Sequence, residues 1–299
     1  MKKMMLSAVG LVLVAQLATA QIRTPSPSPA ATVMQTIGVT DVTVKYSRPS
    51  LKGRTPFTAE FVPTGSVWRT GANGATAFTT TTDLMVNGKS LAAGSYAVLS
   101  IPAASEWTLI FSKDMAVTEQ SYKQDNDVLR VSMTPSKTGQ KVETFTIGFN
   151  NVTDSTATMD IMWADVKASA NLAANTSANA AASVDKAVAD KPDDVNTLTA
   201  AASYNLSKGR NLEQSLSYVD KAIAAKETYR NLWLKAQILG KMGKFAEAMP
   251  LAQKALAMGE TSGDASFSFF KDAIAKGVTE YQSKMPVAIP AKGKGKKKA

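Results

Sequence analysis

The chain has 299 residues, contains no cysteine and no histidine, and carries a formal net charge of +10. These two absences exclude a cysteine nucleophile, a histidine general base, a Ser-His-Asp triad and His or Cys sites for zinc or haem. No stretch shows the acidic spacing of a calcium loop, so no cofactor is expected. Stability must come from the core, which a chain of this length can build in two domains.

The positive charge is concentrated at the two ends. Lys2 and Lys3 precede an apolar stretch, and the tail Lys292–Lys298 holds five lysines and no acid. The body between them is nearly neutral, so no specific nucleic-acid binding is expected. Runs of like charge are usually disordered and solvated, and we predict this for residues 286–299. An accessory contact of this tail with anionic glycan, lipid headgroups or nucleic acid stays open.

The N-terminus has the layout of a secretory signal. Two lysines, an apolar stretch from Met4 to Leu17 and the small residues Ala18-Thr-Ala20 follow one another. The alternative, a membrane anchor, needs about 18 to 20 apolar residues, and this stretch is shorter. We predict a signal peptide over residues 1–20, cleavage after Ala20, and a periplasmic or extracellular protein without a transmembrane span. Residues 21–30 are predicted to be an extended Pro/Ser linker.

Residues 31–165 have β character, with short segments rich in Val, Ile, Thr and aromatic residues. Alternation is clear at Val42, Val44 and Tyr46, and Asn87-Gly88 is a strong hairpin signal. Strands at this spacing without a helical period predict an all-β antiparallel sandwich or barrel. The candidate strands are Thr32–Ile37, Asp41–Tyr46, Thr76–Thr81, Leu84–Val86, Ser95–Ile101, Glu106–Phe111, Asp127–Met133, Val142–Phe149 and Thr156–Trp163.

The last third of the chain is predicted to be helical. Residues 166–194 form an Ala-rich connecting segment that ends in Pro192-Asp-Asp194, a helix-start signal. Several residues then recur after 33 positions, among them Ala222 with Ala255. This period of paired helices over residues 195–285 resembles the tetratricopeptide family, apart from Pro250 inside the second helix. The resemblance is best in Leu234–Gly240, Gly243–Ala248 and Ala252–Leu256.

Three arginines and an asparagine gather in loop-like sequence between the β segments, beside two tryptophans. Arginine presents a planar fork of donors that suits carboxylate, phosphate or sulfate, so this group is a candidate cradle for a polar or anionic ligand. The same side chains would serve equally as structural latches on loop carbonyls, and the tryptophans as core. Glu60 and Glu106 are a weaker candidate for a glycosidase pair. The candidate ligand-binding residues are Arg48, Arg54, Trp68, Arg69, Asn73 and Trp107.

Over about residues 30–165 the β region resembles domain of unknown function 2911, a family of exported bacterial proteins whose name implies no activity. The chain departs from the family pattern at Met115–Tyr122, where a Trp-Gly segment is expected. The motifs that carry the resemblance are Tyr46-Ser-Arg-Pro49, Gly53-Arg54, Val67-Trp-Arg-Thr-Gly-Ala-Asn73, Ala92-Ala-Gly94 with Tyr96, Ile101-Pro102, Glu106-Trp107, Phe111 with Lys113-Asp114, and Asp127-Val-Leu-Arg130.

Two classes of function follow. In the favoured one the protein is an exported, non-enzymatic binding or scaffold protein. Its β domain recognises a polar or anionic ligand, such as a glycan or a peptide carboxylate, and its helical repeats dock a protein partner. The alternative is a histidine-free hydrolase or lyase that uses carboxylates near Arg54 and Arg69 on an anionic or glycan substrate. The two differ in whether acidic side chains converge with the arginines in one open pocket.

Overall fold

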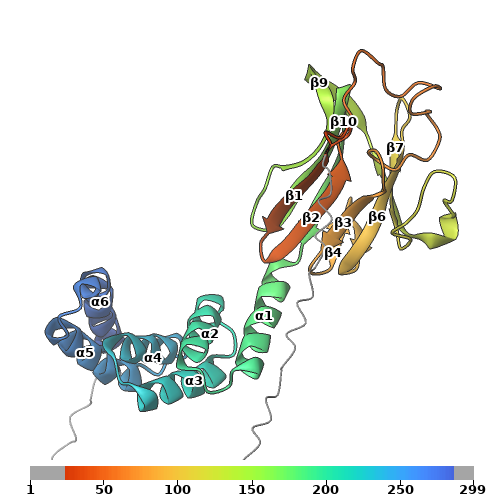
Figure 1. The fold of residues 1–299 in the computed structure, drawn as a ribbon. Coiled ribbons are helices and arrows are strands. Elements are labelled where there is room, and N and C mark those ends of the chain that lie inside the picture. The colour runs from red at the N-terminus through yellow and green to blue at the C-terminus, as the bar shows by residue number, and fades with distance from the viewer. Residues whose placement is uncertain (1–23, 286–299) are drawn as a thin grey trace, which may run out of the picture. The chain divides into compact units, whose positions relative to one another are not determined.

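The computed structural model describes residues 24–285 (Figure 1), and the chain divides after Ala174 into two compact units. The predicted signal peptide, the start of the linker and the Lys-rich tail lie outside the described residues. The predicted order of an antiparallel β domain followed by an all-α region is confirmed. No helix of residues 24–285 combines the length and apolar character needed to cross a membrane.

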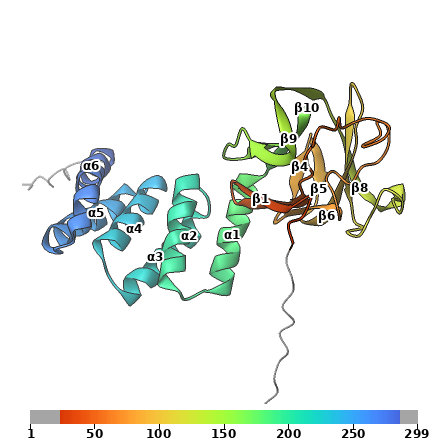
Figure 2. The same cartoon turned by 45° about the horizontal axis from the view of Figure 1, so that its top comes forward.

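The first unit is a sandwich of two antiparallel sheets, visible from two directions in Figures 1 and 2. One sheet has the order β1-β2-β3-β6-β7-β8 and the other β5-β4-β10-β9. Phe78 and Phe111 of the first sheet and Phe145 and Trp163 of the second lie in one buried core. The strands are β1 (Ala30–Ile37), β2 (Thr40–Ser47), β3 (Thr76–Thr80), β4 (Leu84–Val86), β5 (Lys89–Leu91), β6 (Gly94–Ile101), β7 (Trp107–Ser112), β8 (Asp127–Met133), β9 (Pro135–Asn150) and β10 (Thr156–Ala174).

The predicted Asn87-Gly88 turn joins β4 to β5. Both residues have positive φ, 45° and 78°, as a tight two-residue hairpin requires. The turn also protects the edge of the other sheet, because the Asn87 amide donates to the Ser132 carbonyl of β8 at 2.6 Å. Lys89 donates to the next outward carbonyl, that of Arg130. These bonds satisfy backbone acceptors that an edge strand otherwise exposes.

The last two strands are longer than their sequence predicts. β9 begins at Pro135 and β10 continues past Trp163 to Ala174, so the first part of the predicted connecting segment is strand. Small residues alternate inward along this extension, with Ala168, Ala170 and Leu172 buried. Alanine is depleted in strands in general, and for this reason its abundance here indicated a connecting segment.

The second unit consists of helices, each packed against the next in sequence. Asp194 caps α2 as the Pro192-Asp-Asp194 signal predicts, since its carboxylate accepts from the Thr197 N–H at 2.8 Å. α5 runs through Pro250 without interruption. Ala222 and Ala255 are fully buried. The helices are α1 (Thr176–Asp190), α2 (Val195–Lys208), α3 (Leu212–Ala225), α4 (Tyr229–Lys241), α5 (Phe245–Thr261) and α6 (Ser268–Lys284).

Candidate functional site

The Tyr46-Ser-Arg-Pro49 motif spans the end of β2 and clamps the free edge of β9. The Tyr46 hydroxyl donates to the Ile147 carbonyl and accepts from its N–H, both at 3.0 Å. Arg48 donates through Nε to the Phe145 carbonyl at 3.0 Å and through Nη2 to the Thr146 hydroxyl at 2.7 Å. Arg48 is therefore occupied by the strand and joins the two sheets as a latch.

Arg54 is held by the turn that contains it. Its Nε donates to the Leu51 carbonyl at 3.0 Å and its Nη2 to the Ser50 carbonyl at 2.9 Å. The guanidinium carbon lies 4.0 Å from the centre of the Phe61 ring, a cation–π contact. Arg54 and Glu60 line an open depression of about 670 Å³ together with Phe61. This location is separate from that of the other predicted binding residues.

Arg69 and Asn73 contact each other and tie together three loops. The Arg69 guanidinium donates to both carboxylate oxygens of Glu119 and to the Asn73 carbonyl. The Asn73 amide donates to the Ser28 carbonyl and the Ser47 hydroxyl, each at 3.2 Å. The arginine and asparagine side chains thus fall into separate groups, each paired within the protein.

Electrostatics support the same conclusion for Arg69. The hydrogen bond to Glu119 raises the pKa of Arg69. Burial alone would raise the pKa of Glu119, but the hydrogen bonds from Arg69 dominate and hold it below its ordinary value of 4.5. Both groups are charged at neutral pH and form a charge-assisted, bidentate hydrogen-bonded pair.

The two predicted tryptophans differ in access. Trp68 is 6% exposed, and its indole N–H donates to the Gly71 carbonyl at 3.1 Å. Trp107 is also buried, yet its edge lines an open pocket. Both rings pack edge-to-face against Phe57, with centroid distances of 6.0 and 4.9 Å. Of the predicted residues, Trp107 alone is among those that line this pocket.

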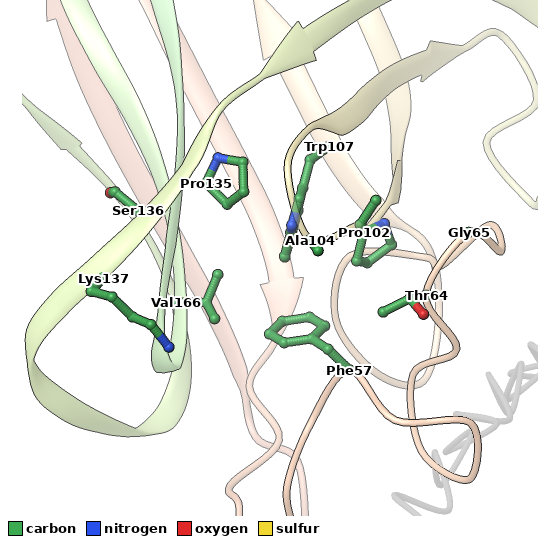
Figure 3. A pocket seen from close by; sticks show the side chains of 11 residues that line it. Phe57, Thr64, Gly65, Pro102, Ala104, Trp107, Pro135, Ser136, Lys137 and Val166 are labelled. Carbon is green, nitrogen blue, oxygen red and sulfur yellow. The ribbon is translucent and has the colours of Figure 1, made fainter.

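The pocket has a volume of about 640 Å³, within the range typical of sites for small molecules. Figure 3 shows Pro135, Lys137 and Val166 on one side of the Phe57 ring and Thr64, Gly65 and Pro102 on the other. The walls are mostly apolar. The lining residues are Phe57, Thr64, Gly65, Pro102, Ala103, Ala104, Trp107, Pro135, Ser136, Lys137 and Val166.

A bulge in β10 helps to shape this wall. The register with β9 shifts on either side of Ala164, which has a φ of 52°. Such a bulge bends a strand and re-aims the side chains that follow it. Here Val166 joins the pocket lining, and Asp165 lies at the exposed rim in an ion pair with Lys137. The hydrogen bond that Lys137 donates to Asp165 holds the pKa of Asp165 below its ordinary value.

The acidic residues that a hydrolase would need lie elsewhere. Asp127 accepts hydrogen bonds from the Tyr122 hydroxyl at 2.6 Å and from Arg130 at 3.0 Å. Burial and the bond to Asp127 raise the pKa of Tyr122 to about 12. No carboxylate belongs to the lining of the 640 Å³ pocket. Within residues 24–285 no three acidic side chains gather in a way that could hold a metal ion.

Sequence reasoning did not identify most of the pocket. Its walls come from the loop after β2, the β6–β7 turn, the start of β9 and the part of β10 that follows the bulge at Ala164. Pro135, Ser136 and Lys137 look like an ordinary loop, and nothing in the sequence places them beside Val166. Apart from the predicted Trp107, the available signal was Phe57, an aromatic residue in a Pro- and Gly-containing loop.

Comparison with known families agrees with the predicted resemblance. Residues 28–172 match the family described as "Protein of unknown function (DUF2911)", which covers the β unit. Neither the curated proteins nor the solved structures contain a match to the chain.

Proposed function

We propose that this protein is an exported, non-enzymatic binding protein whose β domain holds a small molecule with an apolar body. The observation that carries the proposal is the 640 Å³ pocket lined by Phe57, Trp107 and Val166. Apolar lining with a few polar groups is typical of ligand sites. The arginines do not form one ligand site, since they lie in separate groups and each donates to partners within the protein.

The lack of a carboxylate in the pocket lining also supports binding over hydrolysis. A glycosidase needs two carboxyl groups within about 10 Å across the scissile bond. Glu60 lies in the separate depression with Arg54, and Asp127 is paired with Arg130. Glu60 is the single carboxylate in the lining of that depression, so it does not supply the pair that a glycosidase needs.

The binding proposal can be tested with phenylnaphthylamine, a neutral apolar dye whose fluorescence rises in apolar sites. Ala104 is exposed at the pocket, so Ala104→Trp should fill the space without disturbing the core. We expect this variant to bind the dye at least about tenfold more weakly, a loss of about 1.4 kcal/mol. Ala92→Trp, on an exposed turn outside the lining, is the matched control. Equal affinity of all three proteins would refute the pocket as the binding site.

For the helical unit we propose a tetratricopeptide-like arrangement that docks a protein partner. Two buried pairs of residues 33 positions apart support it: Ala222 with Ala255, and Ser215 with Ala248. α2, the loop before α4 and the start of α4 line a groove of about 470 Å³, whose accessible surface is mostly apolar although most of its residues carry polar groups.

A photo-crosslinking residue placed at Ser203 in this groove should capture a partner in cells, whereas the same residue at Ser217, exposed on α3, should not. Crosslinks of equal yield at both sites, or at neither, would contradict docking in the groove.

Export is part of the same proposal and has a direct check. The mature protein isolated from the periplasm or medium should begin at Gln21, because the small residues Ala18 and Ala20 favour cleavage there. An intact Met1 terminus on the cell-associated protein would contradict it.

A further inference from the structure

We propose that the ligand of the β-domain pocket carries an anionic head group, and that Lys137 binds this group in exchange for Asp165. The inference rests on the proposed function, because it assumes that the 640 Å³ pocket is the binding site. Carboxylate, sulfonate and phosphate groups share the required chemistry.

The charge of the lining points to an anion. Lys137 is the only ionisable side chain among the lining residues, and Figure 3 shows its ammonium end directed toward Val166 and Phe57. Thr64 and Ser136 are neutral hydroxyl residues, and the other lining residues are apolar or glycine. The acidic partner of Lys137, Asp165, lies outside the lining, so the wall itself carries a cation and no carboxylate and favours an amphipathic anion over a cationic ligand.

The Asp165 carboxylate competes with a ligand anion for the ammonium group of Lys137. The two side chains form an ion pair at the rim, where they are 79% and 61% exposed. Ion pairs this exposed contribute little, because water screens the attraction and two flexible side chains must be ordered. Lys137 can therefore leave Asp165 for a ligand anion at small cost.

Only one member of the ion pair, Lys137, belongs to the pocket lining. The bulge at Ala164 places Val166 in the pocket wall, while Asp165 lies outside the lining. An incoming anion would meet Lys137 at the wall, and the apolar part of the ligand would contact Val166, Phe57 and Trp107. Lys137 should then raise the affinity for an anion, and Asp165 should lower it.

The test compares two dyes that share one apolar body. Anilinonaphthalene sulfonate carries a sulfonate, and phenylnaphthylamine is the neutral counterpart. The measured quantity is the affinity of the full mature protein for the sulfonate dye divided by its affinity for the neutral dye. Lys137→Met should lower this ratio about three- to tenfold, because it removes the charge and keeps most of the unbranched side chain. Asp165→Asn should raise the ratio, because it removes the competitor. High salt should lower the ratio for the wild type.

Lys141→Met is the matched control, since Lys141 is an exposed lysine on the same strand outside the lining. An unchanged ratio in Lys137→Met, or an equal fall in Lys141→Met, would overturn the anion proposal while the pocket itself stands. Failure of both dyes to bind, or binding that Ala104→Trp leaves unaltered, would refute the pocket and the anion proposal together.

Discussion

Several side chains between Tyr46 and Asn73 satisfy groups that the sandwich leaves without strand partners. Tyr46 and Arg48 donate to carbonyls of β9, and Arg54 donates to carbonyls of its own turn. Buried or half-buried carbonyls without a partner are costly, so a planar fork of donors is useful there. The clustering of arginine, tyrosine and asparagine in this segment has a structural cause.

The Arg69–Glu119 pair gives the sharpest test of this cause. We expect Arg69→Met to lower the free energy of unfolding by about 1 to 3 kcal/mol, because it leaves a half-buried carboxylate with fewer donors. The folded-state pKa of Glu119 lies below 4.5, so its contribution is complete above that pH and is lost as pH falls through the folded-state value. The difference between wild type and variant should therefore shrink in acid. Chemical denaturation at neutral pH and well below pH 4.5 measures this, and a difference that grows in acid would contradict it.

Tyr46→Phe removes one hydroxyl that serves both backbone groups of Ile147. We expect a loss of about 1 to 2 kcal/mol in unfolding free energy. Tyr96→Phe is the control, because the Tyr96 hydroxyl bonds a single exposed carbonyl, that of Ala92. An equal loss of stability in the control variant would show that the hydrogen bonds of Tyr46 to Ile147 do not hold the edge of β9.

At this scale the sequence identifies the residue types and their segment, but not their partners. The carbonyl of Phe145 lies almost a hundred residues after Arg48, and only the pairing of the two sheets brings it near. A loop with arginine beside tryptophan can face a ligand or a neighbouring strand. Its composition does not distinguish these two roles. Trp107 shows the limit well, since it is core and pocket wall at once.

Among the helices, the 33-residue recurrence makes a prediction about packing. Ala255 is fully buried in α5, so Ala255→Leu should overpack its contact and cost about 1 to 3 kcal/mol. Ala257→Leu places the same change on an exposed position of α5. Thermal denaturation of the two variants measures the difference. Equal melting temperatures would mean that the recurrence has no packing role.

The strands show which elements sequence can predict. Segments with Val, Ile and aromatic residues at alternate positions, such as Val42 and Val44, were placed to within a few residues. The end of β10 was not, because its inward positions are alanines, whose intrinsic preference is helical. Burial in the sandwich overrides that preference at Ala168 and Ala170. The bulge at Ala164, which shapes the pocket, leaves no sequence signal since it lacks a glycine.

For the whole molecule, the division after Ala174 predicts where a protease cuts first. α1 has no buried residue, whereas Lys167 lies within β10 and is paired with Ser136. Trypsin cleaves segments that open locally, so we expect cleavage after Lys186 before Lys167. Mass spectrometry of early digests identifies the site. Early cleavage after Lys167 would place the end of the β domain before Ala174.

We propose that the β domain binds its ligand in the pocket at Trp107 and that the arginines are structural. The chain has four tryptophans, whose indole N–H signals in a ¹H–¹⁵N NMR spectrum can be assigned by substitution. On titration with phenylnaphthylamine, the Trp107 signal should move most, while Trp233 of the helical unit and the Nε–H signals of Arg54 and Arg69 stay in place. A fixed Trp107 signal together with shifts at Arg54 or Arg69 would contradict the claim and return the site to the arginine cluster.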